Sequence, residues 1–368
     1  MGADRLGEAI AAAHARRNQM ESPVADGEPI TAETFRETFA RARDEIRKVV
    51  AGQEQAIEHL LAAILAGGHV LLRGMPGLGR TLLVKTLARV LGLEYRRVQF
   101  TPDLLPSDII GAEVLEGHAT TGERSFRFFP GPVFANLLLA DEINRSPTRT
   151  QNALLEVMQE RQVTVAGHTH FLPRPFALVA TQNTLDTEGV FPLGEAQIDR
   201  FMVQIDQRYP TQAEEKRMLA LTTGMAAGGP EQVAEPSTVL AMQRLAREVP
   251  VVPAVRDFAL AIVRGSRPGE PQASAQAERT VRLGASPRAA QALLLVGKVL
   301  ALARGRRHVA VADVADVAEP VMAHRILLDF RARAEGADHR TLLASLVAEA
   351  HERTMPKLSR WTRQALRK

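Results

Sequence analysis

The spacing of apolar residues predicts two helices at the start of the fold. Phe35 and Phe39 recur at helical spacing after Thr31, whose hydroxyl suits an N-cap. A second helix is expected to run to Leu65, where a Gly-Gly pair ends it. Residues 1–30 are rich in alanine and charge and end in a stretch containing Pro and Gly, so we expect a loose N-terminal extension there.

Strand and helix patterns then alternate over residues 31–210. The short apolar runs that predict strands are "HVLLRG", "EYRRVQF", "VFANLLLADEIN" and "PFALVATQN", and helical patterns lie between them. This alternation predicts an α/β fold with a mostly parallel sheet covered by helices. Ligands of such sheets bind at the carboxyl ends of the strands, so candidate chemistry should gather at that edge.

A helical region follows the α/β core. Residues 211–237 read as a helix and a Gly/Pro-rich linker, and residues 238–335 as a smaller domain made only of helices. Residues 336–368 are expected to form a helical tail. The sequence therefore predicts two domains with extensions at both ends.

Composition narrows the classes of protein. No window holds 18 consecutive apolar residues, and the N-terminus lacks an apolar signal core, so we expect a soluble, cytoplasmic protein without a membrane span. The absence of cysteine excludes disulfides, thiol catalysis and cysteine-ligated zinc. The positive charges are mostly arginine, since only six of the 46 Lys and Arg residues are lysine. The formal net charge is +4, and so mild an excess of positive charge is weak support for nucleic-acid binding.

The stretch "GMPGLGRT" at residues 74–81 has the form of a phosphate-binding loop. It matches the pattern of Gly, four residues, Gly, Lys and then Ser or Thr, except that Arg80 stands at the lysine position. Glycines let backbone N–H groups approach phosphate oxygens, and the Thr81 hydroxyl is available for Mg²⁺. The residues expected to hold nucleotide are Gly74, Met75, Pro76, Gly77, Leu78, Gly79, Arg80, Thr81 and Leu82.

Two further strands end in polar residues. "NLLLADEIN" positions Asp141 to hold Mg²⁺ through water and Glu142 to orient or deprotonate an attacking water. "LVATQN" positions Asn183 to hold that water against the terminal phosphate. A solvated strand end, or an ordinary turn residue, explains each segment taken alone. Their shared position after a glycine loop favours a site for ATP and Mg²⁺.

Two arginines complete the candidate catalytic set. Arg200, in "EAQIDRFM", is of the type that stabilises charge on a transferred phosphate, an effect of about 10³–10⁵ in rate. Arg288 follows Ser286 and Pro287 at the start of a helix, where a cation gains nothing from the helix dipole. That position favours contact with an anion over a purely local role.

Together these segments resemble one family, the MoxR-type AAA+ ATPases. The resemblance runs from about residue 45 to 330 and rests on "RRVQFTPDLLPSDIIGAEV", "LLLADEINRSPTRTQNALLEVMQERQVTVAG", "EGVFPLGEAQIDRF" and "LGASPRAAQALLL". It implies an AAA+ core with a helical lid, a homo-oligomer that is usually a hexameric ring, and ATP held between neighbouring subunits. It also implies chaperone-like remodelling of a client protein complex and a partner with a von Willebrand factor A domain.

The resemblance also assigns roles. It implies the Walker A loop at 74–81, the Walker B pair Asp141 and Glu142, and the sensor-1 residue Asn183. Arg200 takes the position of an arginine finger acting on the neighbour's ATP, and Arg288 the sensor-2 position acting in its own subunit. The family's two hairpin inserts, expected here at about 112–129 and 162–175, usually face the pore of the ring and its clients.

Three local features qualify this interpretation. Arg80 keeps the charge of a lysine but presents a wide planar fork, so we expect ATP binding with slow hydrolysis. Gly194 stands where the family usually has proline, so we expect a looser approach to Arg200. His168 and His170 share one face of the second hairpin, but two ligands do not make a metal site, and solvent-facing residues are the favoured interpretation.

Two other functions stay open. One is a nucleotide-gated scaffold that hardly hydrolyses ATP because of Arg80. The other is a nucleic-acid-dependent motor, although the second hairpin is poor in basic and aromatic residues, unlike a surface that binds nucleic acid.

Overall fold

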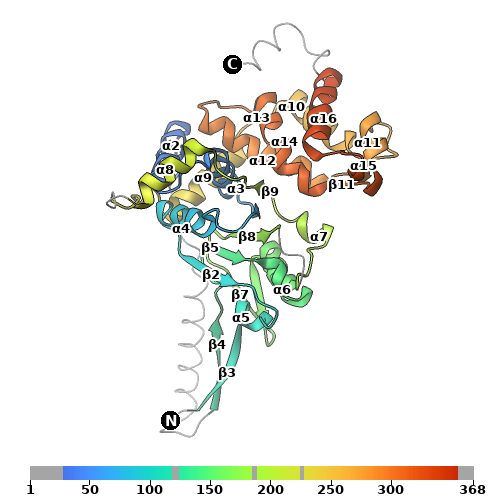
Figure 1. Ribbon diagram of the computed structural model, residues 1–368. Coiled ribbons are helices and arrows are strands. Elements are labelled where there is room, and N and C mark those ends of the chain that lie inside the picture. The colour runs from blue at the N-terminus through green and yellow to red at the C-terminus, as the bar shows by residue number, and fades with distance from the viewer. Residues whose placement is uncertain (1–27, 118–123, 185–188, 224–227, 355–368) are drawn as a thin grey trace, which may run out of the picture.

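The computed structural model describes residues 28–117, 124–184, 189–223 and 228–354 of the chain, so most of the predicted N-terminal extension and the end of the predicted tail lie outside the described residues. An α/β part holds a five-stranded sheet, and helices dominate the rest of the chain (Figure 1). Every pairing within this sheet is parallel, which confirms the predicted α/β class. None of the helices in these ranges is long and apolar enough to cross a membrane.

The sheet has the strand order β2-β5-β8-β1-β9. Its strands are β1 (Val70–Gly74), β2 (Tyr95–Gln99), β5 (Leu137–Asp141), β8 (Ala177–Asn183) and β9 (Val203–Asp206). The central strands are almost continuously apolar and buried, as expected for parallel strands covered on both faces. Gly74 lies opposite Asn183 in the register, so the ends of β1 and β8 are neighbours.

The described helices of the α/β part are α2 (Ala32–Arg47), α3 (Glu54–Leu65), α4 (Arg80–Val90), α5 (Pro106–Ile110), α6 (Thr148–Glu160) and α7 (Glu195–Ile198), with a 3-10 turn η1 (Ile143–Arg145). Helices α3, α4 and α6 pack directly against the sheet, and the others are shorter or more distant from it. The predicted cap at Thr31 is confirmed, because its side chain accepts a hydrogen bond from the backbone N–H of Thr34 at 3.1 Å. The second predicted helix ends at Leu65, as expected.

Two antiparallel strand pairs stand apart from the central sheet. The first joins β3 (Gly111–Gly117) to β4 (Arg124–Pro130), and the second joins β6 (Gln162–Val165) to β7 (His168–Phe171). The second pair turns through Ala166 and Gly167, both with positive φ. In Figure 1 the β3–β4 hairpin extends away from the helical part of the molecule.

The C-terminal part is mainly helical. Its helices are α8 (Gln212–Thr223), α9 (Pro236–Glu248), α10 (Pro253–Gly265), α11 (Ala275–Thr280), α12 (Pro287–Ala303), α13 (Val311–Asp316), α14 (Ala318–Met322), η2 (Ala323–Arg325), α15 (Phe330–Ala334) and α16 (His339–Thr354). It also contains a short antiparallel pair, β10 (Val281–Leu283) with β11 (Leu327–Leu328). The prediction of helices alone missed this pair, because two or three residues are too few to show strand alternation.

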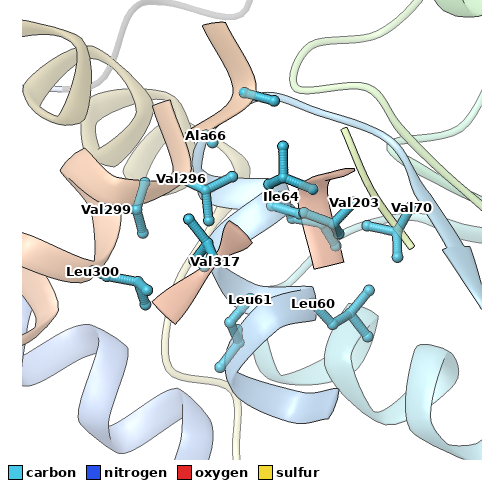
Figure 2. Packing of buried hydrophobic residues seen from close by; sticks show 14 of the residues in the cluster. Leu60, Leu61, Ile64, Ala66, Val70, Val203, Val296, Val299, Leu300 and Val317 are labelled. Atoms are coloured by element: carbon cyan, nitrogen blue, oxygen red, sulfur yellow. The ribbon is translucent and has the colours of Figure 1, made fainter. Parts of the chain in front are cut away.

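One apolar core joins the sheet to the helical part. Leu61 and Ile64 of α3 are fully buried, and Figure 2 shows α3 packed with Val70 and Val203 of the sheet and Val296 of α12. Because burial of apolar surface is the main stabilising term in folding, this shared core fixes the helical part against the sheet.

Candidate functional site

The glycine loop between β1 and α4 has open space over part of its backbone. Gly77 and Gly79 have φ of 84° and 71°, the left-handed region that glycine adopts without strain. A Cβ built on either residue would meet nothing within 4 Å, so open space lies over both. Gly79 is also the N-cap of α4, whose first-turn N–H groups have no partner within the helix. A phosphate group fits this loop.

Arg80 is folded back onto the loop rather than extended from it. Its side chain donates to the carbonyl oxygens of Gly74, of Met75 at 2.6 Å and of Gln182 at 3.2 Å, and the residue is only 9% exposed. Burial lowers the pKa of the guanidinium, while the nearby carboxylates of Asp141 and Glu142 oppose that shift. An arginine remains charged under such conditions, so the cation is retained but its N–H groups are engaged by backbone oxygens.

Asp141 ends β5 with both carboxylate oxygens engaged. Oδ1 accepts from the Thr181 hydroxyl at 2.6 Å, and Oδ2 accepts from Nε and a terminal nitrogen of Arg97 at 3.0 and 2.7 Å. The sequence did not indicate Arg97 as a site residue, because its partner lies far along the chain. A cation at Asp141 must therefore compete with a guanidinium.

Glu142 has a strained backbone and a restrained side chain. Its φ of 57° and ψ of 50° are uncommon for a residue with a Cβ, and such conformations concentrate at functional sites. The carboxylate accepts from the Gln99 side chain at 3.0 Å and lies 3.1 Å from Nε of Arg145. The Glu142 backbone N–H donates to the Thr181 hydroxyl at 2.8 Å, which ties the end of β5 to β8.

Most predicted site residues meet at the carboxyl edge of three adjacent strands. Asn183 is buried at the end of β8, directly opposite Gly74 in the register. Asp141 ends the neighbouring strand β5. The Thr81 and Leu82 side chains lie in the first turn of α4, half-buried and 44% exposed respectively. The loop, the acidic pair and the asparagine therefore share one edge of the sheet.

Arg200 and Arg288 lie together at the opposite edge; we call them the arginine face. Both line a cavity of about 100 Å³ with His69, which immediately precedes β1. The backbone N–H of Met202 also donates to the His69 carbonyl at 2.8 Å. The length of β1, about 16 Å at ~3.3 Å per residue, separates this cavity from Gly74.

This placement differs from the expectation for Arg288. A sensor-2 residue acting in its own subunit should lie near its own glycine loop, yet Arg288 lies 3.4 Å from Asp199, beside Arg200. The predicted helix start is nevertheless confirmed, because the Ser286 hydroxyl caps α12 and accepts from the Arg288 backbone N–H. The sequence fixes the local turn but does not show which edge of the sheet the helix approaches.

Gly194 occupies a conformation that proline also adopts. Its φ is −70°, within the range of proline, but its backbone N–H donates to the Gln197 side chain at 2.7 Å. Proline would lose this hydrogen bond. Compared with proline, the glycine lacks a rigid ring but makes a capping hydrogen bond in the turn that leads to Arg200.

The second histidine of the β6–β7 hairpin is not a simple solvent-facing residue. His168 is exposed, whereas the His170 ring stacks on Phe128 of β4 with centroids 3.9 Å apart. The stack joins the two hairpins. In the part of the chain that the structure describes, no group of three or more His, Cys, Asp or Glu side chains could hold a metal ion.

Comparisons with known proteins agree with this geometry. A family model described as "ATPase family associated with various cellular activities (AAA)" matches residues 69–203, and an AAA lid domain model matches residues 273–346. The chain is 41% identical to "Chaperone MoxR1" of Mycobacterium tuberculosis, over 88% of this chain and 84% of that protein. It is 33% identical to "Protein MoxR" of Methylorubrum extorquens, over 80% of this chain and 89% of that protein.

A solved structure is also similar. A candidate ATPase from Cytophaga hutchinsonii superposes with a TM-score of 0.78 at 38% identity, covering 86% of this chain and 95% of that one. The similarity to the named MoxR proteins spans both the sheet and the helical lid. The chain therefore belongs to the MoxR-type AAA+ ATPases.

Proposed function

We propose that the chain binds ATP and Mg²⁺ at the interface between subunits of a hexameric ring, and hydrolyses ATP to remodel a client protein complex. The observation that carries this proposal is the separation of the loop, Asp141, Glu142 and Asn183 from the arginine face on the other edge of the sheet. An arginine about 16 Å from its own loop cannot stabilise charge there, but in a ring it faces the next subunit. We therefore assign both Arg200 and Arg288 to the neighbour's nucleotide.

The residues at the loop edge fit Mg²⁺ and a phosphate chain. Oxygen ligands suit Mg²⁺, and Thr81 and Asp141 would hold it. When bound, the ion would neutralise charge on the β- and γ-phosphates. Glu142 would accept a proton at a carboxylate oxygen as the water oxygen bonds to the γ-phosphorus. The bond from that phosphorus to the β-phosphate oxygen then breaks, which yields ADP and phosphate.

Client contact is assigned to the hairpins. Phe126 on β4 is 71% exposed and Phe171 on β7 is 61% exposed, and Val114 and Leu115 on β3 are also exposed. An exposed cluster of apolar side chains marks an interaction surface on a protein, so we propose that the client presents apolar segments. A protein with a von Willebrand factor A domain, the partner class of the family, is the proposed second component.

Nucleotide-binding variants test the proposal. Thr81→Ala should weaken binding of a fluorescent ATP analogue in the presence of Mg²⁺ about tenfold, while Glu142→Gln should keep the affinity and stop turnover. The reason is that Glu142→Gln removes the base but leaves the loop intact. An equal loss of affinity in both variants would contradict the assigned roles.

The hydrogen bonds of Arg80 favour one alternative, a nucleotide-gated scaffold. A guanidinium that donates to Gly74, Met75 and Gln182 has few N–H groups left for phosphate. If that arrangement persists with ATP bound, the protein would assemble on nucleotide and hydrolyse it poorly. Single-turnover hydrolysis separates the two functions.

The nucleic-acid-dependent motor also has one observation in its favour. Arg127 lies over the ring of Phe129 on the first hairpin, 5.5 Å from its centroid, which adds a cation and aromatic rings to this surface. We expect single-stranded DNA to leave the hydrolysis rate unchanged. Stimulation by DNA that Phe126→Ala abolishes would replace the client proposal.

A further inference from the structure

Asp199, the residue before Arg200, joins the α/β part to the helical part. Its carboxylate accepts from the Ser286 hydroxyl at 2.8 and 2.9 Å and from Nε of Arg325 at 2.9 Å. A terminal nitrogen of Arg288 lies 3.4 Å away. Three donors from the C-terminal part of the chain thus converge on one carboxylate in the segment that carries Arg200.

Arg325 makes most of its hydrogen bonds to the same segment. Its side chain is 2% exposed, and besides Asp199 Oδ1 it donates to the carbonyl oxygens of Asp199 at 3.1 Å, Phe201 at 2.6 Å and Met202 at 3.1 Å, and to that of Val321. These bonds use every N–H of the guanidinium. Burial lowers the pKa of Arg325 to about 10, and Asp199 opposes the shift. The backbone around Arg200 is therefore anchored to the lid.

The arginine face brings two cations close together. Arg200 and Arg288 line one cavity of about 100 Å³, and Nε of Arg200 is buried without a hydrogen-bond partner among the described residues. Like charges in such a position repel, and the Asp199 carboxylate reduces that repulsion. Asp199 also holds the Arg288 side chain, which comes from the lid, by a direct contact. It holds Arg200 through the backbone, because the two residues are adjacent in the chain.

We propose that Asp199 is a positioning residue that holds Arg200 and Arg288 at the spacing needed to meet the phosphates of a neighbouring subunit's ATP. This inference rests on the proposed function, in which both arginines serve the neighbour. It makes Asp199 part of the surface that one subunit presents to the next, even though Asp199 itself touches no nucleotide. Its loss should impair the neighbour's site and leave its own site intact.

Complementation between variants tests this directly. Asp199→Asn alone should keep ATP affinity within about twofold and lower hydrolysis at least tenfold, a split expected when only the transition state loses an interaction. In assemblies mixed with Glu142→Gln subunits, hydrolysis should return at interfaces that pair an intact loop site with an intact arginine face, about one interface in four for equal mixing. A variant with a general folding defect would not be rescued.

Asp199→Glu is the control for a folding defect in Asp199→Asn. It keeps a charge for Arg325 but moves the carboxylate, and a displacement near 1 Å can cost about 10²-fold in rate. Hydrolysis by Asp199→Glu should therefore fall, with recovery in the same mixture. Wild-type hydrolysis by Asp199→Glu, or by Asp199→Asn, would overturn the proposal.

A mixture of Arg200→Ala and Glu142→Gln subunits is the reference that separates a failure of the role of Asp199 from a failure of the proposed function. If this reference recovers activity and the Asp199 variants do not, the role of Asp199 is refuted and the proposed function stands. If neither mixture recovers in assemblies shown to be mixed, the arrangement between subunits fails, and the role of Asp199 fails with it.

Discussion

A terminal nitrogen of Arg80 lies 3.2 Å from the carbonyl oxygen of Gln182, the residue before Asn183. With the bonds to Gly74 and Met75, this contact ties the glycine loop to β8. A residue at the position of a phosphate-binding lysine therefore acts as a brace between the loop and the strand that bears Asn183.

Arg80→Lys should raise single-turnover hydrolysis about tenfold while ATP affinity changes little. The two terminal nitrogens of Arg80 reach these three carbonyls, whereas a lysine ammonium is one compact centre on a flexible stem. The lysine is therefore freer to follow the γ-phosphate, and the charge that attracts ATP is the same. A tenfold gain corresponds to about 1.4 kcal/mol of barrier. Arg80→Ala, which loses both charge and brace, is the control and should bind ATP more weakly. Slower hydrolysis by Arg80→Lys would show that the loop has adapted to arginine.

Arg97→Gln should lower the Mg²⁺ concentration needed for half-maximal ATP binding by up to about fivefold. The Arg97 guanidinium occupies Asp141 at 2.7 Å, and partly exposed pairs of this kind contribute roughly 0.2–1 kcal/mol. Arg96→Gln is the matched control, because Arg96 lies on the same strand as Arg97 but pairs with Glu94, the residue before β2. An equal Mg²⁺ requirement in both variants would refute competition at Asp141.

Arg288→Ala should be rescued in mixed assemblies with Glu142→Gln. Arg288 lies beside Asp199 and Arg200, so under the proposed arrangement its loss should damage the neighbour's site rather than its own. The hydrolysis rate of the mixture, compared with each variant alone, is the measurement. Loss of ATP affinity without rescue would restore the role in its own subunit that the family resemblance implies.

His69 should make stability depend on pH in mildly acidic solution. Burial lowers the pKa of its ring to about 4; the ring accepts from the Leu178 N–H at 3.0 Å and contacts the Met158 carbonyl through Nε2. Because the folded pKa lies below the unfolded value near 6.5, this neutral ring stabilises the fold fully above that pH, and the contribution is lost as the pH falls toward 4. The slope reaches about 1.4 kcal/mol per pH unit.

Urea unfolding between pH 7 and pH 5 measures this slope. His69→Asn should be less stable overall but should depend less steeply on pH than the wild type, because the titrating ring is gone. The partly buried residues His59 and His324, whose pKa values are also lowered mainly by burial, leave a residual slope of the same sign. Identical slopes in wild type and His69→Asn would contradict the assignment.

The sequence predicted the loop edge of the site because its signals are local. Apolar runs ending in Asp141 and Asn183 identify buried parallel strands with polar tips, and parallel strands bring those tips to one edge. The glycine pattern fixed the loop in the same way. Local patterning therefore sufficed for the fold class and for most of the candidate nucleotide residues.

The contacts that control those residues could not be predicted in this way. Arg97 reaches Asp141 across neighbouring strands, and Arg325 reaches Asp199 from the far end of the chain. In a chain rich in arginine, no spacing distinguishes these arginines from solvated ones. The edge on which Arg288 lies depends on how the lid packs against α3 and β9, which is decided by the shared core.

Single-turnover hydrolysis of ATP with Mg²⁺, comparing wild type with Glu142→Gln, tests the central claim most directly. Both assembled proteins should bind ATP with similar affinity, and the wild type should release phosphate at least 10²-fold faster, the scale of a general base. Glu142→Gln keeps the loop, Asp141 and the contact surface, so a difference reports the chemical step. A wild type that releases phosphate no faster than Glu142→Gln would contradict an ATPase and leave the nucleotide-gated scaffold as the function.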